Sequence, residues 1–464
     1  MTLGGRSLRQ LTPREVVFVG GETPSIYQHT GGLVLLDTSE RPGFGYDDFR
    51  GHVEERLSLL PHFRWKLHEV LLGLDLPYWV EDEEFDFDNH VHRIALPSPG
   101  DRRSLGELVS YLYSRHLDRR RPLWEAWFIE GLEDGGFAFF TKLHHSMMDG
   151  EGAARLGELL CDVEPDADPP RVDPDIAGAT AGEVPSLLHQ SAVAAGRLAY
   201  LPVRAGLEVA GGVQRFAAGR LRGSGGEDGG EPLPLAGFNC DIGADRGFVF
   251  GSVPLDEVKA VKDHFGVTVN DVALALVSGA LRGFLSERDE LPGSSLRTSI
   301  AVSLRDKGDE DFSNHVTTAA VTLATAQADP VVRLRSIAGE TGAAKARAHQ
   351  GSKGFLEMMG ILPPVLVNLA LSAAPAQIVP RAAGFNLIVS NVRGSPVPLY
   401  FAGGRITALY PMSIIMPGGG LNVTCMSYAD ELEFGLTVDP VWFREPWPLV
   451  DGLRETLDSY LEAV

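Results

Sequence analysis

The apolar positions of this 464-residue chain form two kinds of pattern, and each predicts a different secondary structure. Short, nearly continuous apolar runs are typical of strands covered on both faces. They predict strands at 32–37, 137–143, 297–304, 316–323, 385–391, 421–428 and 432–438. Apolar residues spaced three or four positions apart predict helices, because such residues share one helix face.

Three helices are predicted from that spacing in the second half of the chain. The first runs from Leu255 to Phe265 and ends at Gly266. The next begins with the capping-box-like pair Thr268 and Asp271 and continues to about residue 284. The last has an apolar face formed by Trp447, Val450, Leu453, Leu457 and Leu461. Strands mixed with helices predict an α/β fold.

Two stretches of biased composition divide the chain. Residues 162–175 are rich in Asp and Pro, and residues 223–234 are rich in Gly, Glu and Pro, as is typical of linkers and loops. We therefore expect an N-terminal domain at 1–165, a linker with helices at 166–235 and a C-terminal domain at 236–464. A chain of this length is consistent with two or three domains.

The linker contains a basic apolar segment, residues 184–222. It carries five Arg and one Glu, a local net charge of +4 in a chain whose overall net charge is −21. Two helices broken near Pro202 are predicted. They either cross over and pack on the domains or present a basic amphipathic face to anionic lipid, and the sequence leaves both open.

Charge and cysteine content indicate which partners and which cellular compartment to expect. The net charge of −21 repels phosphate backbones, so no nucleic-acid partner is expected. The start, Met1 to Gln10, lacks the apolar core of a secretory signal. Three widely spaced cysteines fit a reducing cytosol and form no CxxC zinc pattern; they are Cys161, Cys240 and Cys425.

One uncharged segment, residues 358–379, is long enough to cross a bilayer. Pro363, Pro364 and Pro375 interrupt it, and a helix would break at each of them. We therefore expect a buried or interfacial segment, either a core helix or part of the wall of an acyl pocket.

The strongest chemical signal is the run His144-His145-Ser146-Met147-Met148-Asp149-Gly150 between a predicted strand and a helical pattern. One imidazole can act as a general base, the carboxylate can fix its surroundings, and glycine permits a sharp turn. Such a site needs no nucleophilic Ser or Cys, which indicates direct acyl transfer to a hydroxyl or amine with His145 taking the proton. Zinc is the alternative, since His and Asp both bind it, but the run is not HExxH and no third ligand is obvious nearby.

An ordered set of further motifs resembles the bacterial wax ester synthase/diacylglycerol acyltransferase family. That family shares HHxxxDG with chloramphenicol acetyltransferase (CAT), related acyl-CoA-dependent acyltransferases and peptide-synthetase condensation domains. The resemblance covers nearly the whole chain and is carried, beyond the histidine run, by Arg121 to Glu125, Glu130 to Leu132, Phe238-Asn239, Val269 to Val272, Phe385 to Leu387, Ser390 to Val392, Leu409 to Pro411 and Gly420 to Val423.

The resemblance implies two CAT-like α/β domains with an active-site tunnel at their interface, where acyl-CoA and an alcohol enter from opposite faces. It implies that His145 is the base, that His144 is structural and that Asp149 orients the motif. Gly150 would leave room for the acyl donor. No metal, cofactor or prosthetic group is implied, because acyl-CoA is a substrate and CoA leaves as product.

An imidazole has an ordinary pKa near 6.5, so its neutral form is available to deprotonate an alcohol. The tetrahedral oxyanion formed on the thioester needs hydrogen-bond donors. Candidates are Asn270, Ser390 and Asn391, although Asn270 can equally serve a helix start and the other two a turn before Gly394. The basic pair Arg119-Arg120 is either solvated or binds the phosphates of CoA, and Trp124 and Trp127 are expected to pack in the core.

The chain departs from the family pattern near its start, at Leu11 to Glu15, at Gln28-His29-Thr30-Gly31, and at Ser313-Asn314. These departures leave the substrate range open.

The expected function is transfer of a fatty acyl group from acyl-CoA to diacylglycerol, to a long-chain alcohol, or to both. We expect a cytoplasmic protein, and as a further expectation one that attaches peripherally to the inner membrane face or to lipid droplets. The alternatives are a same-fold acyltransferase with another acceptor, such as a polyketide or glycolipid, and a non-catalytic lipid-binding protein.

Overall fold

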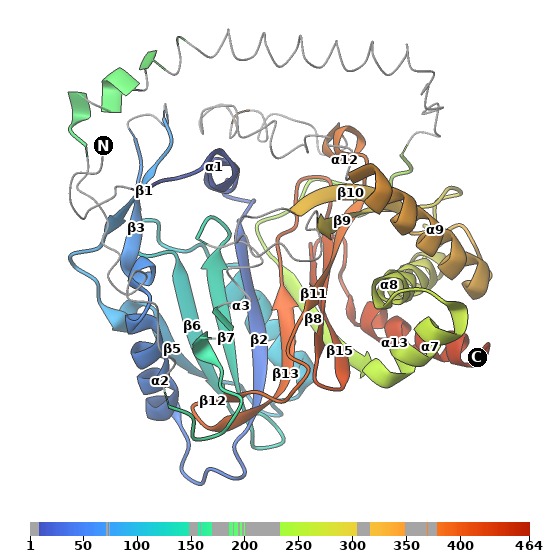
Figure 1. Ribbon diagram of the computed structural model, residues 1–464, viewed down its shortest axis with the longest axis horizontal. Helices are drawn as coiled ribbons and strands as arrows, with labels where there is room; N and C mark the ends of the chain where they lie inside the picture. Colours follow the sequence, from blue (N-terminus) through green and yellow to red (C-terminus); the bar gives the residue numbers. More distant parts are fainter. Residues whose placement is uncertain are drawn as a thin grey trace.

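Two six-stranded sheets form the framework of the protein (Figure 1). The computed structural model describes residues 9–70, 73, 75–147, 156–157, 159–168, 185–188, 190–193, 195–196, 199, 233–303, 316–348, 369 and 378–464. The first sheet has, in spatial order, the strands β12 (Tyr400–Phe401), β13 (Gly404–Met412), β2 (His29–Asp37), β7 (Phe137–His144), β6 (Trp124–Glu130) and β5 (Val91–Ala95). Its pairs are antiparallel except β5 with β6.

The second sheet carries most of the C-terminal half. Its strands, in spatial order, are β10 (Val316–Thr322), β9 (Arg297–Ser303), β11 (Leu387–Arg393), β14 (Leu421–Tyr428), β15 (Glu431–Val438) and β8 (Gly247–Pro254). β11 runs parallel to both of its neighbours, β9 and β14. The helices of this half are α7 (Leu255–Phe265), α8 (Val269–Ser286), α9 (Pro330–Ala348), α12 (Ile378–Ala383) and α13 (Trp447–Leu461). α8 packs against α7, α9 and α13, the group at the right of Figure 1.

A third, three-stranded sheet supports a short helix near the ends of β2 and β7. Its order is β1 (Arg9–Gln10), β4 (Tyr78–Glu81) and β3 (Trp65–His68). The helix, α1 (Pro13–Gly20), has a capping box formed by Thr12 and Glu15. Val16 and Val19 of α1 are buried in one cluster with Trp65 and Trp79 of the small sheet. Packing therefore fixes α1 beside the strand ends that carry the histidine run (Figure 1).

The remaining N-terminal elements cover the first sheet. α2 (Tyr46–Ser58) packs Phe49 and Val53 against it, in one cluster with Phe128 and Phe139. Short 3-10 turns occupy Pro61–Arg64 and Phe87–Asn89. α3 (Arg102–Tyr113), whose first turn is capped by Asp101, packs against β8 of the second sheet.

The two halves share a hydrophobic core. Val109 of α3 and Phe140 of β7 lie in one buried cluster with Phe250 of β8 and Trp447 of α13. Burial of apolar surface is the main stabilising term in folding, so this shared cluster stabilises the two sheets as one body.

The sheets also cross directly, where β13 contacts β14 and β15. At Gly435 a Cβ atom would lie 1.9 Å from the carbonyl oxygen of Pro411, so only glycine allows the two strands to come this close. The backbone N–H of Leu409 donates to the buried carboxyl group of Glu433 at the same crossing.

The strands and the three helices that were predicted by residue range are present. All seven predicted strands are found, and the largest change is that β2 begins at His29. The capping box at Thr268 and Asp271 begins α8 as predicted. The domain boundaries stay a prediction, but the sheets are not divided as the sequence suggested, because β12 and β13 come from the predicted C-terminal domain and complete the first sheet.

Two predicted segments lie largely outside the described residues, namely 184–222 and 358–379. Among the described helices, α8 alone has the length and apolarity that would suit a membrane span. The structure buries 67% of that window, as expected for a core helix.

Candidate active site

The two histidines lie where β7 ends. His144 is the last residue of β7, and its partner in the antiparallel register with β2 is His29. His145 follows in a turn, and its backbone N–H donates to the carbonyl oxygen of Gln28 at 2.7 Å. The strand therefore stops inside the motif, and the two imidazoles acquire different surroundings.

His144 is held from both ring nitrogens. Its Nδ1 accepts the backbone N–H of Ser146 at 3.1 Å and lies 2.6 Å from the Ser146 hydroxyl oxygen. Because a backbone N–H can only donate, the ring proton lies on Nε2. That Nε2 is 3.3 Å from Oε1 of Glu22, and the His144 side chain is 1% exposed. The geometry suits a structural role and not proton exchange with a substrate.

Glu22 is the charged centre of this buried corner. Its carboxylate lies near His144, 3.8 Å from His29 Nε2 and 3.7 Å from Arg119 Nε. It also accepts the backbone N–H of Gln28 at 3.2 Å. Burial acts to raise the pKa of Glu22, but the hydrogen bond from His144, together with the positive charge of Arg119, outweighs it and lowers the pKa to about 2. Glu22 is therefore an anion throughout the working pH range.

His29 is a neutral member of the same corner. Burial, followed by the nearby charge of Lys142, lowers its pKa well below the ordinary value. Its ring lies edge-on to that of His144 at 6.3 Å between centroids, and its carbonyl accepts the hydroxyl of Tyr113 at 2.6 Å. The segment around His29, where the chain departs from the family pattern, thus contacts the histidine motif from the neighbouring strand.

His145 has the more open position of the two. Its side chain is half-buried and stacks on the ring of Phe18 from α1, with centroids 4.1 Å apart and planes within 8°. The ring is therefore held by one face in a partly exposed turn. A base must be reachable by the substrate hydroxyl, and the half-buried His145 meets that requirement better than the fully buried His144.

Arg119 is partly exposed, at 36% of its side chain, and is held by ion pairs. It pairs with Glu22, lies 3.1 Å from Glu69 and donates to the carbonyl oxygen of Val19 at the end of α1. Arg120 pairs with Asp118 on the surface. Trp124 is buried as predicted, with its indole N–H donating to Phe63, and Trp127 is partly buried.

The oxyanion candidates lie at the second sheet. The amide of Asn391 on β11 donates to the side-chain oxygen of Asn270 at 3.4 Å, so the structure brings these two together. Thr268 and Asp271 already cap α8, so the helix start does not need Asn270 as its cap. Ser390 is the neighbour of Asn391 on β11, and consecutive strand residues face opposite sides of a sheet. The oxyanion role of all three stays a prediction.

The rest of the motif is outside the described residues: Met148, Asp149 and Gly150 have no described placement. The predicted roles of Asp149 and Gly150 stay predictions. Among the described residues, no group of three His, Cys, Asp or Glu side chains is arranged to hold a metal ion.

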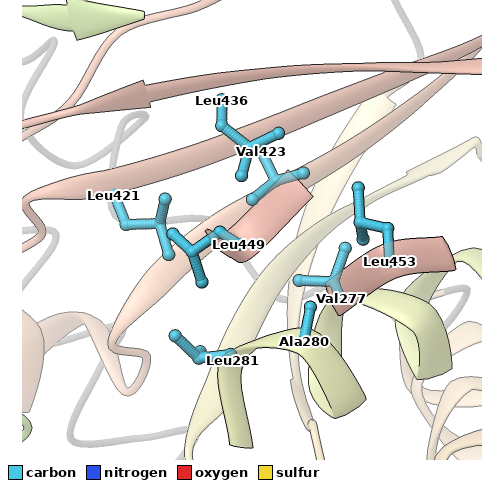
Figure 2. A pocket seen from close by; sticks show the side chains of 8 residues that line it. All are labelled: Val277, Ala280, Leu281, Leu421, Val423, Leu436, Leu449 and Leu453. Atoms are coloured by element: carbon cyan, nitrogen blue, oxygen red, sulfur yellow. The ribbon is translucent and has the colours of Figure 1, made fainter. Parts of the chain in front are cut away.

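Figure 2 shows a small apolar cavity in the second half, between α8, α13 and the strands β14 and β15. Its volume is about 10 Å³, close to the room that one water needs. The side chains that line it are Val277, Ala280, Leu281, Leu421, Val423, Leu436, Leu449 and Leu453. A space of this size with no polar lining is a packing gap and not a substrate site.

Sequence reasoning missed Glu22 and Phe18. Glu22 is 122 positions before His144, and no periodicity links them; only the pairing of β2 with β7 brings them together. Phe18 had a local signal, because Thr12-Pro13-Arg14-Glu15 is the signature of a helix start. That signature predicts α1, although not which residue Phe18 would contact.

Family models match two parts of the chain. The wax ester synthase/diacylglycerol acyltransferase catalytic domain matches residues 11–273, and the C-terminal domain of the same family matches residues 312–460.

Relatives of similar length support the match. A Mycobacterium tuberculosis (strain ATCC 25618 / H37Rv) protein named for diacylglycerol O-acyltransferase activity is 34% identical, over 99% of this chain and 91% of its own. A second protein of that strain, tgs2, named for the same activity, is 33% identical over 97% and 98%.

Solved structures agree in fold. The wax ester synthase/diacylglycerol acyltransferase from Marinobacter aquaeolei VT8 superposes with a TM-score of 0.71 at 28% identity, covering 97% of this chain and 98% of that one. The TRI3 trichothecene 15-O-acetyltransferase from Fusarium sporotrichioides, at 12% identity and a TM-score of 0.58, shares the fold over 99% and 97% of the two chains. The α/β fold with two CAT-like halves is therefore shown, and this chain belongs to the wax ester synthase/diacylglycerol acyltransferase family.

Proposed function

We propose that this acyltransferase moves a fatty acyl group from acyl-CoA to diacylglycerol, a long-chain alcohol, or both, with His145 as the general base. The observation that carries the proposal is the contrast between the two histidines. His144 is buried between Glu22 and Ser146, whereas His145 is half-buried, lies in the turn after the strand and stacks on Phe18.

The proposed reaction begins when the His145 imidazole takes the proton of the acceptor hydroxyl. The hydroxyl oxygen then attacks the thioester carbonyl, a C–O bond forms, and the carbonyl oxygen becomes an oxyanion. Collapse breaks the C–S bond, and the CoA thiolate recovers the proton from the imidazolium. General base catalysis supplies about 10²–10⁴-fold, so positioning and oxyanion donors supply the rest.

The proposed oxyanion donors are Asn270 and Asn391, with Ser390 as the third candidate. Their support is that the first two are in contact and that Asn270 is not the cap of α8. Asp149 and Gly150 are proposed to orient the motif and to leave room for the acyl donor. The reaction as proposed uses acyl-CoA as a substrate and needs no metal or prosthetic group.

Purified protein with radiolabelled long-chain acyl-CoA tests the acceptor class. Diacylglycerol and a fatty alcohol are offered in parallel, and the lipid products are separated. Labelled triacylglycerol or wax ester is expected. Acyl transfer to a polyketide or glycolipid acceptor alone would establish the same-fold alternative, and no transfer to any acceptor would leave a lipid-binding protein.

We further propose a cytoplasmic protein that attaches peripherally to the inner membrane face or to lipid droplets, because its acceptors are lipids. Leu187 and Leu188, in the basic linker segment, are 69% and 85% exposed. Exposed apolar side chains in a segment of net positive charge suit an interfacial segment on anionic lipid.

Vesicle sedimentation tests this attachment. The double variant Leu187→Ser/Leu188→Ser is expected to lose most binding to vesicles containing anionic lipid. Val441→Ser provides a matched control, since Val441 is 68% exposed in the C-terminal half. Equal binding by the wild type and both variants would contradict a role for the linker.

A further inference from the structure

The ring of Phe18 covers one face of the His145 imidazole at stacking distance. The centroids are 4.1 Å apart and the planes differ by 8°, so the rings are nearly parallel. Both side chains are half-buried, and the two residues come from separate elements, α1 and the turn after β7. The stack is therefore made by the tertiary fold.

α1 holds Phe18 in a fixed place. Its N-terminus has the Thr12 and Glu15 capping box, and Val16 and Val19, which flank Phe18, are buried against the small sheet. At its other end, Arg119 donates to the carbonyl oxygen of Val19 and also pairs with Glu22. The same arginine thus joins the helix that carries Phe18 to the carboxylate that holds His144.

His145, the other partner of the stack, is held by a hydrogen bond of its backbone. The N–H of His145 donates to Gln28 of the segment before β2, and Gln28 in turn donates to Glu22. The main chain of His145 is consequently attached to the sheet, while one face of its ring contacts Phe18.

We infer that Phe18 is a positioning residue for His145, which fixes the plane of the ring and stabilises it when it gains a proton. The inference rests on the proposed role of His145 as the base. An aromatic face carries partial negative charge, so a cation over it is attracted. The imidazole becomes a cation as the acceptor alcohol is deprotonated, and the stack therefore favours the transition state over the ground state.

In the part of the chain that the structure describes, the charged and titratable groups of this corner are Glu22, His29, His144 and Arg119, with Glu69, His116 and Lys142 next to them. Phe18 itself has no ionisable group. Substitution of Phe18 therefore changes the interaction of the His145 ring without adding or removing a charge.

The test compares Phe18→Leu, which keeps an apolar side chain but removes the aromatic face, with Phe18→Tyr, which keeps the face. kcat/KM for acyl transfer is measured from pH 5 to pH 9, with thermal unfolding alongside. Phe18→Leu is expected to lower kcat/KM by about 3- to 30-fold, to leave KM for acyl-CoA within about twofold, and to move the acidic limb down by about 0.3–1 pH unit. Phe18→Tyr is expected to stay within about twofold of the wild type.

Phe87→Leu is the matched control, because Phe87 is another half-buried ring whose described contacts are with Arg50, Phe85 and Trp124. It is expected to leave the acidic limb in place. If Phe18→Leu lowers stability or activity and its acidic limb coincides with that of the wild type, Phe18 is only a packing residue and the inference is overturned. If His145→Ala retains turnover, the proposed base itself fails, and the two failures are thereby distinguished.

Discussion

At the residue scale, one buried carboxylate organises the site. Glu22 is 8% exposed and has two histidines and an arginine within 4 Å. A buried charge is stable only where other groups replace its hydration, and the motif supplies them. In return, Glu22 favours the ring proton of His144 on Nε2, so the tautomer of this histidine is set before substrate binds.

Removal of this carboxylate has a predicted cost. Glu22→Ala leaves the buried His144 without its carboxylate partner, and breaking a buried pair in this way costs about 3–5 kcal/mol of unfolding free energy. Glu22→Gln keeps the shape and is expected to cost less, while still reducing turnover. Urea unfolding and CoA release measure the two effects. Full stability of Glu22→Ala would show that the network is not stabilising.

The lowered pKa of Glu22 also fixes the sign of its pH dependence. Its ordinary pKa is 4.5 and its folded pKa about 2, so the unfolded chain binds the proton more readily. The stability it contributes is present above about pH 4.5 and is lost as the pH falls towards 2.

At the element scale, apolar runs predicted the central strands well and missed elements whose pattern is weaker. β13 alternates buried and exposed residues and contains a bulge between Ile406 and Ala408, so no continuous run marks it. α2 has a polar sequence and buries only a narrow face. The histidine site was found from its local sequence, but its partners Glu22 and Phe18 are tertiary neighbours that no local pattern places.

A buried lysine connects β7 to the end of α3. The ammonium group of Lys142 pairs with Glu125 at 2.9 Å and donates to the carbonyl oxygens of Leu112 and Arg115. Burial lowers its pKa, and Glu125 opposes that change. The side chain is fully buried, so this cation has a structural role and holds β7 to the end of α3.

Lys142→Met is therefore expected to destabilise the protein, by about 1–3 kcal/mol for each carbonyl left unsatisfied. Lys66→Met is a useful comparison, because Lys66 also pairs with a carboxylate, that of Asp82, but is 32% exposed. Thermal unfolding should show a clearly larger loss for Lys142→Met. Equal losses of thermal stability in the two variants would contradict this structural role of Lys142.

At the scale of the whole molecule, the two halves are connected in two ways. The strands β12 and β13 of the C-terminal half complete the first sheet, and β13 crosses the second sheet at a buried carboxyl group, that of Glu433. β13 belongs to the first sheet and yet contacts β15 of the second, where Glu433 accepts the N–H of Leu409. Burial raises the pKa of Glu433 to about 8, with a further contribution from Glu431 and opposition from the Leu409 hydrogen bond. The crossing is therefore held with a protonated carboxyl at neutral pH.

The sign of this effect is opposite to that of Glu22. The folded state keeps a proton that the unfolded chain releases near pH 4.5, so Glu433 makes the unfolding free energy fall as the pH rises from about 4.5 to about 8. Glu433→Gln keeps the shape without the charge and should flatten that fall. Urea unfolding of both proteins from pH 5 to 9 measures the difference, and parallel curves would contradict the buried acid.

The central claim is that the His145 imidazole removes the acceptor proton while His144 only supports it. The most direct measurement is CoA release by His145→Ala with diacylglycerol or a fatty alcohol present, alongside thermal unfolding of the same protein. Turnover is expected to be lost while the unfolding transition stays close to that of the wild type. Near-normal turnover by a folded His145→Ala protein would contradict it.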